Sequence, residues 1–182
     1  DNIYCWGNNN MGQLGDGGSK VQAKPDKVRF LGSSNAFSPT FSSLSSGYSH
    51  TCILANGNQI YCWGANTYGQ LGTGNTNNAL SPILVPTGFM SFKNVSSAGF
   101  HTCALAEYDQ MYCWGYNNSG EAGTGDIESN IKIPTPVNQI FSQGFETMAL
   151  GGTQSCAISD TDERTYCWGG NQASQLGVRS TS

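Results

Sequence analysis

The tetrapeptide Tyr-Cys-Trp-Gly occurs four times in this chain, and its regular recurrence constrains the fold more than any other feature. The copies begin at Tyr4, Tyr61, Tyr112 and Tyr166, which places successive copies 57, 51 and 54 residues apart. Each copy is followed by a stretch rich in Gly and Asn, and the last three copies are preceded by His50-Thr51-Cys52, His101-Thr102-Cys103 or Gln154-Ser155-Cys156. A period of this length in strand-forming sequence favours propeller blades over helical repeats.

Composition supports an all-β chain and excludes two classes of partner. The 182 residues include 24 Gly, a proportion that suits short strands and tight turns better than helices. The net charge is −4 and there is no basic face, which argues against nucleic acid as a partner. No apolar run approaches the roughly 20 residues of a membrane span. The chain opens at Asp1 rather than Met, and we expect it to be processed or partial.

The segment around the second copy of the motif is predicted to be a β-hairpin. Residues 49–54 form the first strand, Asn56-Gly57 marks the turn and residues 59–63 form the return strand. Alternation puts apolar side chains on both faces of each strand. This pattern is expected where a strand is buried on both sides, as it is when blades stack face to face.

The succession Gly-x-x-His-Thr-Cys and Tyr-Cys-Trp-Gly-x-Asn-x-x-Gly-Gln-Leu-Gly resembles the regulator of chromosome condensation repeat, over essentially the whole chain. The resemblance implies an all-β fold of four-stranded antiparallel β-propeller blades in a seven-bladed ring, of which this chain would hold about three and a half. We expect a partial blade over residues 1–42, blades over 43–93 and 94–148, and a partial blade over 149–182. All four would belong to one propeller domain, expected to be part of a longer chain.

Six of the seven Cys fall into pairs spaced 10, 10 and 11 residues apart: Cys52 with Cys62, Cys103 with Cys113, and Cys156 with Cys167. In a hairpin the members of each pair would face one another across the strands, close enough for a disulfide. The 10-residue spacing requires an odd loop with Gly57 left-handed, and the 11-residue spacing requires an even loop. Zinc binding is the alternative, although there is no Cys-x-x-Cys and His is scarce. Cys5 is left over, and its partner is expected about ten residues before Asp1.

The paired Cys favour an oxidising compartment, and we predict an extracellular or cell-surface location. Two sequons, Asn94-Val95-Ser96 and Asn117-Asn118-Ser119, make Asn94 and Asn117 candidates for glycosylation. The chain contains no nucleophile elbow, P-loop or His-Glu-x-x-His motif. We therefore predict a protein that is not an enzyme and that has no catalytic residue, metal site or cofactor.

Residues that recur with the repeat are predicted to be structural. His50 and His101 occupy the same position in successive repeats, which favours a hydrogen-bonding role, and the four Trp are expected to pack between blades. The candidate binding residues are Tyr48, Phe100 and Thr153, each of which follows a Gly just before a His- or Gln-led strand. Aromatic side chains in such loops are typical binding anchors, and burial against a neighbouring blade is the alternative.

Together these features predict a non-catalytic extracellular β-propeller that binds a protein or a glycan, or that builds a structural assembly. An open arc of blades would expose strand edges, so copies of the chain or the remaining blades of a longer chain are further expected partners. The resemblance implies an alternative function, a guanine-nucleotide exchange factor-like regulator of a small GTPase. The chain lacks the basic tail expected of a chromatin binder.

Overall fold

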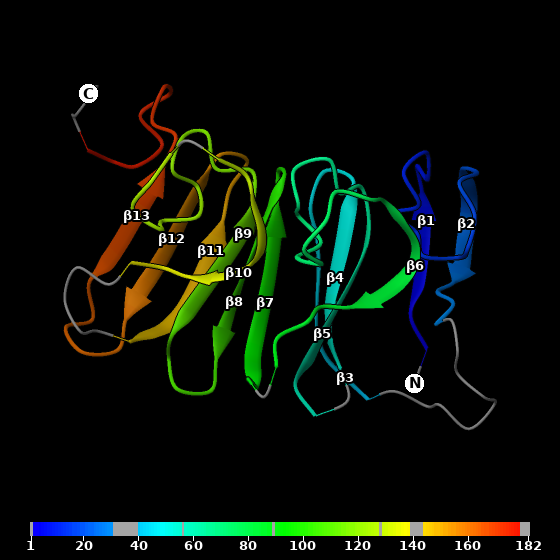
Figure 1. Ribbon diagram of the computed structural model, residues 1–182, viewed down its shortest axis with the longest axis horizontal. Helices are drawn as coiled ribbons and strands as arrows, with labels where there is room; N and C mark the ends of the chain where they lie inside the picture. Colours follow the sequence, from blue (N-terminus) through cyan, green and yellow to red (C-terminus); the bar gives the residue numbers. More distant parts are fainter. Residues whose placement is uncertain are drawn as a thin grey trace.

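A computed structural model describes residues 2–30, 40–55, 57–88, 90–127, 129–138 and 144–178, in which the strands form four antiparallel sheets standing side by side (Figure 1). We call the sheets blades 1 to 4 in chain order. Blade 1 consists of β1 (Tyr4–Gly7) and β2 (Gln22–Lys27), and blade 2 of β3 (Phe41–Ser46), β4 (His50–Ala55), β5 (Gln59–Gly64) and β6 (Ala79–Leu84). Blade 3 consists of β7 (Phe92–Ala98), β8 (His101–Ala106), β9 (Met111–Gly115) and β10 (Ile131–Pro136), and blade 4 of β11 (Phe145–Leu150), β12 (Gln154–Ser159) and β13 (Thr165–Gly169). The predicted all-β array of antiparallel propeller blades is confirmed.

Among the described residues, no helix is long and apolar enough to span a bilayer.

The limits of the blades differ slightly from those expected from the sequence. Residues 43, 94 and 149 fall inside β3, β7 and β11, because each of these strands begins two to four residues earlier, at a Phe. Phe92 and Phe145 are buried and Phe41 is half-buried, so the aromatic side chain that opens each strand belongs to the core. The periodic motifs used to divide the sequence lie further along and do not mark these starts.

The hairpins have the predicted registers. Cys52 pairs with Cys62 across β4 and β5, and the connection between these strands contains Gly57 at φ 75°. Cys156 pairs with Cys167 across β12 and β13, and the amide of Ser159 donates to the carbonyl of Arg164 around a four-residue loop. The odd and even loops follow directly from the 10- and 11-residue spacings.

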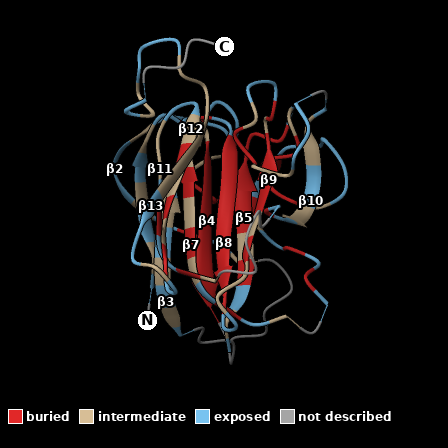
Figure 2. Cartoon of the chain, turned by 90° about the vertical axis from the view of Figure 1, so that its left-hand side faces the viewer, coloured by how far each residue is buried: buried red, intermediate tan, exposed pale blue. Residues whose placement is uncertain are grey.

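The core lies between the blades. Strands β4 and β8 are buried along their whole length (Figure 2), because each stands in the middle of a blade that has a neighbour on both sides. Trp63 and Trp114 are among the largest fully buried side chains. Strand β12 alternates between buried and half-buried positions, since in the described residues blade 4 has a neighbour on one side alone.

In blades 2, 3 and 4 the first strand forms the inner edge of its sheet. Strand β7 contacts both β3 and β11, whereas β2, β6 and β10 form the outer edges of their sheets. Pro25, Pro82 and Pro134 are each the fourth residue of one of these outer strands. Because Pro has no backbone N–H to donate, it protects an edge against pairing with another strand.

The connections fall into two groups at opposite ends of the strands. The connections that follow β3, β5, β7, β9, β11 and β13 gather at one end of the blades, at the top of Figure 1, and we call this end the upper face. The tight hairpins between β4 and β5, β8 and β9, and β12 and β13 lie at the other end, the lower face.

Candidate functional site

At each of the three junctions between blades, one backbone carbonyl in the connection after β1, β5 or β9 accepts hydrogen bonds from the next blade. The carbonyl of Gln70, on blade 2, accepts hydrogen bonds from Trp114 Nε1 and Thr102 Oγ1 of blade 3, both at 2.9 Å. The same pattern joins Trp63 Nε1 and Thr51 Oγ1 to the carbonyl of Gln13, and Trp168 Nε1 and Ser155 Oγ to the carbonyl of Glu121. These recurrent bonds, together with the burial of Trp63 and Trp114, confirm that Trp63, Trp114 and Trp168 pack between blades. Trp6 is 62% exposed, because in the described residues blade 1 has a neighbour on one side alone.

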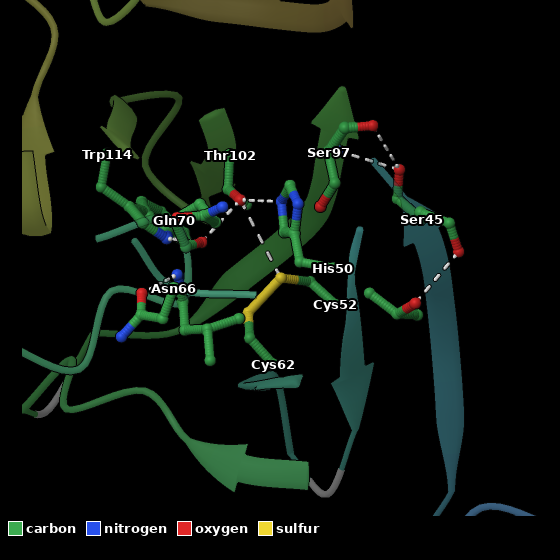
Figure 3. Close-up of a disulfide and its surroundings, with 12 residues drawn as sticks. Ser45, His50, Cys52, Cys62, Asn66, Gln70, Ser97, Thr102 and Trp114 are labelled. Atoms are coloured by element: carbon green, nitrogen blue, oxygen red, sulfur yellow. Dashed lines mark hydrogen bonds between the residues drawn. A yellow bond between two sulfur atoms is a disulfide. The ribbon is translucent and has the colours of Figure 1, made fainter. Parts of the chain in front are cut away.

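The two His side chains add a hydrogen bond at two of these junctions, and in each case the His belongs to the earlier blade and the hydroxyl to the later one. His50 Nε2 lies 2.8 Å from Thr102 Oγ1, and His101 Nε2 lies 3.0 Å from Ser155 Oγ. Because the Thr102 hydroxyl already donates its proton to Gln70, His50 Nε2 must donate to Thr102 (Figure 3). Nδ1 of each ring is buried and has no hydrogen-bond partner. The predicted structural role of these side chains is confirmed.

Burial keeps both His rings neutral. It lowers the pKa of His50 to about 3, with a smaller contribution from repulsion by His101, and it lowers the pKa of His101 to about 4. A ring that is shielded from solvent, neutral and engaged through Nε2 is poorly placed to exchange protons with a substrate.

Four aromatic rings form a continuous row on the upper face, which we call the aromatic ladder. Tyr48 stacks on Phe100 with ring centroids 5.5 Å apart and planes 15° apart. Tyr68 packs edge-on against Phe100 at 5.3 Å and against Tyr116 at 5.1 Å. Tyr48 and Phe100 are 76% and 38% exposed, while Tyr68 and Tyr116 are half-buried beside them. The ladder therefore presents two rings to solvent and holds them from behind with two more.

Of the three predicted binding residues, the structure brings Tyr48 and Phe100 together but assigns them different positions in the repeat. The carbonyls of Ser49, Phe100 and Thr153 accept equivalent hydrogen bonds from the residues that follow β5, β9 and β13. Tyr48 therefore corresponds to Gly99 and Gly152, one position before Phe100 and Thr153. That Tyr48 and Phe100 each follow a Gly in the sequence therefore does not make their positions equivalent, because blade 2 has one more residue between its Gly and its His.

Thr153 lies on the adjoining loop of blade 4. A Cβ on Gly99 would collide with the carbonyl of Gly152, so the loops of blades 3 and 4 pass in direct contact. Thr153 is exposed, and its hydroxyl accepts a hydrogen bond from Gln175 Nε2 at 3.2 Å. It borders the site and adds a neutral polar group to it.

Tyr68 and Tyr116 were not predicted from the sequence. They occupy different positions of the repeat. When their loops are aligned on Gly69 and Gly120, Tyr116 lies three positions earlier in its loop than Tyr68 does. The one signal in the sequence is that both lie in a Gly/Asn-rich loop just after Tyr-Cys-Trp-Gly.

The two sequons have different surroundings. Asn117 is fully buried, and its side chain accepts from the amide of Ala122 and donates to Asp126, so it is unsuitable for glycosylation in the folded chain. Asn9 and Asn66 make equivalent bonds to Leu14 and Leu71, which explains why an Asn is needed there. Asn94 is half-buried on β7, and its Oδ1 accepts a hydrogen bond from the Ser43 hydroxyl. Glycosylation of Asn94 remains a prediction.

Three disulfides join the predicted pairs, Cys52–Cys62, Cys103–Cys113 and Cys156–Cys167. The Cα atoms of each pair are 4.1 Å apart, because the two residues are direct cross-strand neighbours. Their sulfur atoms are therefore engaged with one another rather than with zinc. No group of three or more His, Cys, Asp or Glu suited to a metal ion occurs in the described part of the chain. Cys5 is a half-buried free thiol on β1, and burial raises its pKa.

Blades joined through recurrent carbonyl clamps, with an exposed row of aromatic rings on their upper loops, define a β-propeller of the binding or regulatory class. The model of the regulator of chromosome condensation (RCC1) repeat matches residues 1–54, 58–105 and 108–158, and a second model of the same repeat matches residues 41–70 and 92–121. The chain belongs to the RCC1 repeat family.

Similar proteins include the ultraviolet-B receptor UVR8 of Arabidopsis thaliana, which is 29% identical over 97% of this chain and 39% of its own length. The mitochondrial RCC1 domain-containing protein RUG3 of the same plant is also 29% identical, over 97% of this chain and 40% of its own. Among solved structures, Saccharomyces cerevisiae Prp20p, described with its binding to Gsp1p and histones, matches with a TM-score of 0.82 and 24% identity. That match covers 98% of this chain and 43% of Prp20p. The chain thus spans about two fifths of the length of these relatives.

Proposed function

We propose that this chain is a non-catalytic, extracellular binding module and that its ligand is held at the aromatic ladder on the upper face. The exposed Tyr48–Phe100 stack carries the proposal. Exposed aromatic side chains that are already ordered before binding contribute contact area at little cost in conformational entropy, as expected of binding anchors. The binding or regulatory character of the family supports the same function.

An extracellular location is supported by the disulfides. Each complete hairpin of blades 2, 3 and 4 is closed by a cross-strand bridge. Bridges of this kind persist in oxidising compartments and are rare where glutathione and thioredoxin keep thiols reduced.

A retention experiment tests the two parts of the proposal together. The immobilised chain, the Tyr48→Ala/Phe100→Ala double variant and a Tyr108→Ala control would be exposed separately to extracellular fluid and to cytosol from the same source. Tyr108 is 94% exposed on the lower face and serves as a matched exposed aromatic. We expect a component of the extracellular fluid to be retained by the wild-type chain and the control, and to be lost at least tenfold from the double variant.

Equal retention by all three chains would contradict the binding site, and ladder-dependent retention from cytosol alone would contradict the location. Self-assembly and guanine-nucleotide exchange remain alternative predictions. Nucleotide release from small GTPases, measured with and without the chain, would test the exchange alternative.

A further inference from the structure

The loops that carry the aromatic ladder contain no Lys or Arg. Residues 47–49, 64–78, 99–100 and 115–130 have none, and their only acidic residues are Glu121, Asp126 and Glu128. The side chain of Glu121 is buried, and that of Asp126 accepts a hydrogen bond from Asn117. Among the described residues, the ion pairs lie on the lower face, where Lys93 pairs with Asp109 and Asp162 with Arg164. Lys132, whose backbone lies against Gly69, borders the ladder surface on its outer side.

The loops of the ladder offer neutral hydrogen-bonding groups beside the rings. Thr67, Asn118 and Ser119 are exposed in the loops that carry Tyr68 and Tyr116, and Thr153 is exposed next to the Phe100 loop. Aromatic faces combined with a few neutral amides and hydroxyls bind ligands that present C–H groups on one side and hydroxyls around their rim. A sugar ring has this distribution of groups.

Other classes of ligand suit this surface less well. Nucleic acids and acidic polysaccharides require Lys or Arg for their anionic groups, and none is present in these loops. Protein interfaces are enriched in both aromatic side chains and Arg, and they use complementary charge to select a partner. The ladder has the aromatic side chains without the Arg. We propose that the ladder binds a neutral oligosaccharide, an inference that rests on the proposed function and specifies its ligand.

The four rings have two different roles in the proposed sugar binding. Tyr48 has one face against Phe100 and is mostly exposed, so its other face is available for a sugar ring. Phe100 is held between Tyr48 and Tyr68, and Tyr68 is in turn braced by Tyr116. Tyr48 and Phe100 would contact the sugar, while Tyr68 and Tyr116 position them.

Calorimetric titration of the whole chain with defined oligosaccharides tests the inference. The probes are cellohexaose, mannohexaose and chitohexaose, which are neutral, and oligogalacturonate as the acidic counterpart. We expect at least one neutral hexamer to bind and oligogalacturonate not to bind. Tyr48→Ala and Phe100→Ala should each weaken binding at least tenfold, whereas Tyr48→Phe and Tyr108→Ala should change affinity by less than threefold. Unchanged thermal unfolding of each variant would show that folding is intact.

Failure of this inference is distinguishable from failure of the proposed function. If no neutral hexamer binds, or if Tyr48→Ala binds as tightly as the wild-type chain, the sugar inference is wrong. If the retention experiment then yields a protein whose capture depends on Tyr48 and Phe100, the binding function stands with a different ligand. If neither experiment shows dependence on the ladder, both proposals are wrong.

Discussion

At the scale of single residues, Gly72 makes room for the Trp of the next blade. A Cβ on Gly72 would lie 2.8 Å from Trp114 Nε1, and Gly15 and Gly123 stand in the same relation to Trp63 and Trp168. Gly177 occupies the equivalent position on blade 4, with φ 68° against 71° for Gly72, but a Cβ there would meet nothing within 4 Å. Comparing an Ala substitution at Gly72 with one at Gly177 therefore separates the energetic cost of backbone strain from that of steric crowding.

We predict that Gly72→Ala is clearly more destabilising than Gly177→Ala. Both substitutions place a Cβ in the left-handed region, at a cost of about 1–2 kcal/mol. Gly72→Ala adds a clash with a buried indole, for which overpacking costs about 1–3 kcal/mol more. Urea unfolding of the two variants measures the difference, and equal losses of unfolding free energy would contradict the close packing of Trp114 on this loop.

At the scale of the hairpin, the three disulfides differ in their exposure to reductant. Cys52, Cys62, Cys103 and Cys113 are fully buried, whereas Cys156 and Cys167 are half-buried at the outer side of blade 4. The bridges have the same cross-strand geometry, so access to solvent is the main difference among them.

We predict that Cys156–Cys167 opens first under increasing concentrations of reductant. Each bridge closes a loop of about 10 residues, which stabilises the chain by about 2.7 kcal/mol in the chain-entropy model. Opening the first bridge should therefore lower the unfolding temperature measurably before the others react. Alkylation followed by mass spectrometry identifies the order, and simultaneous alkylation of all six Cys would contradict it.

The hairpins and their bridges could be predicted from the sequence because they depend on local spacing. The distance from Cys52 to Cys62 fixes both the register and the parity of the loop. The ladder could be predicted in part, since Tyr48 and Phe100 were visible as loop aromatics. Tyr68 and Tyr116 were missed because contacts between loops of different blades depend on how the sheets stack. Asn117 was misread for a similar reason, since a sequon does not reveal that its Asn is buried.

At the scale of the whole molecule, the buried His side chains make stability depend on pH. The folded-state pKa values of His50 and His101 are about 3 and about 4, against an ordinary value of 6.5. Below pH 6.5 the unfolded chain binds protons that the folded chain does not. The free energy of unfolding should therefore fall as the pH drops from 6.5 towards 4, by up to about 1.4 kcal/mol per pH unit for each His. Above pH 6.5 the two groups add no pH dependence.

The His50→Gln/His101→Gln double variant should show a flatter profile in this window, because Gln does not titrate. Gln154 occupies the same position in blade 4, and its carbonyl accepts from Gly151 as that of His50 accepts from Gly47. Urea unfolding at pH 7, 6, 5 and 4.5 compares the two chains. Parallel profiles would mean that other groups account for the acid sensitivity.

The recurrent clamp has a consequence for how such chains change over generations. At each of the three junctions, one blade supplies the same backbone carbonyl and the next supplies the same indole and hydroxyl donors. Modules built this way are interchangeable, so gain or loss of one whole period leaves matched surfaces at the new joint. The number of modules can therefore change while the joints between blades are kept. Loop residues that take no part in these joints can change independently, which lets them adapt to new ligands.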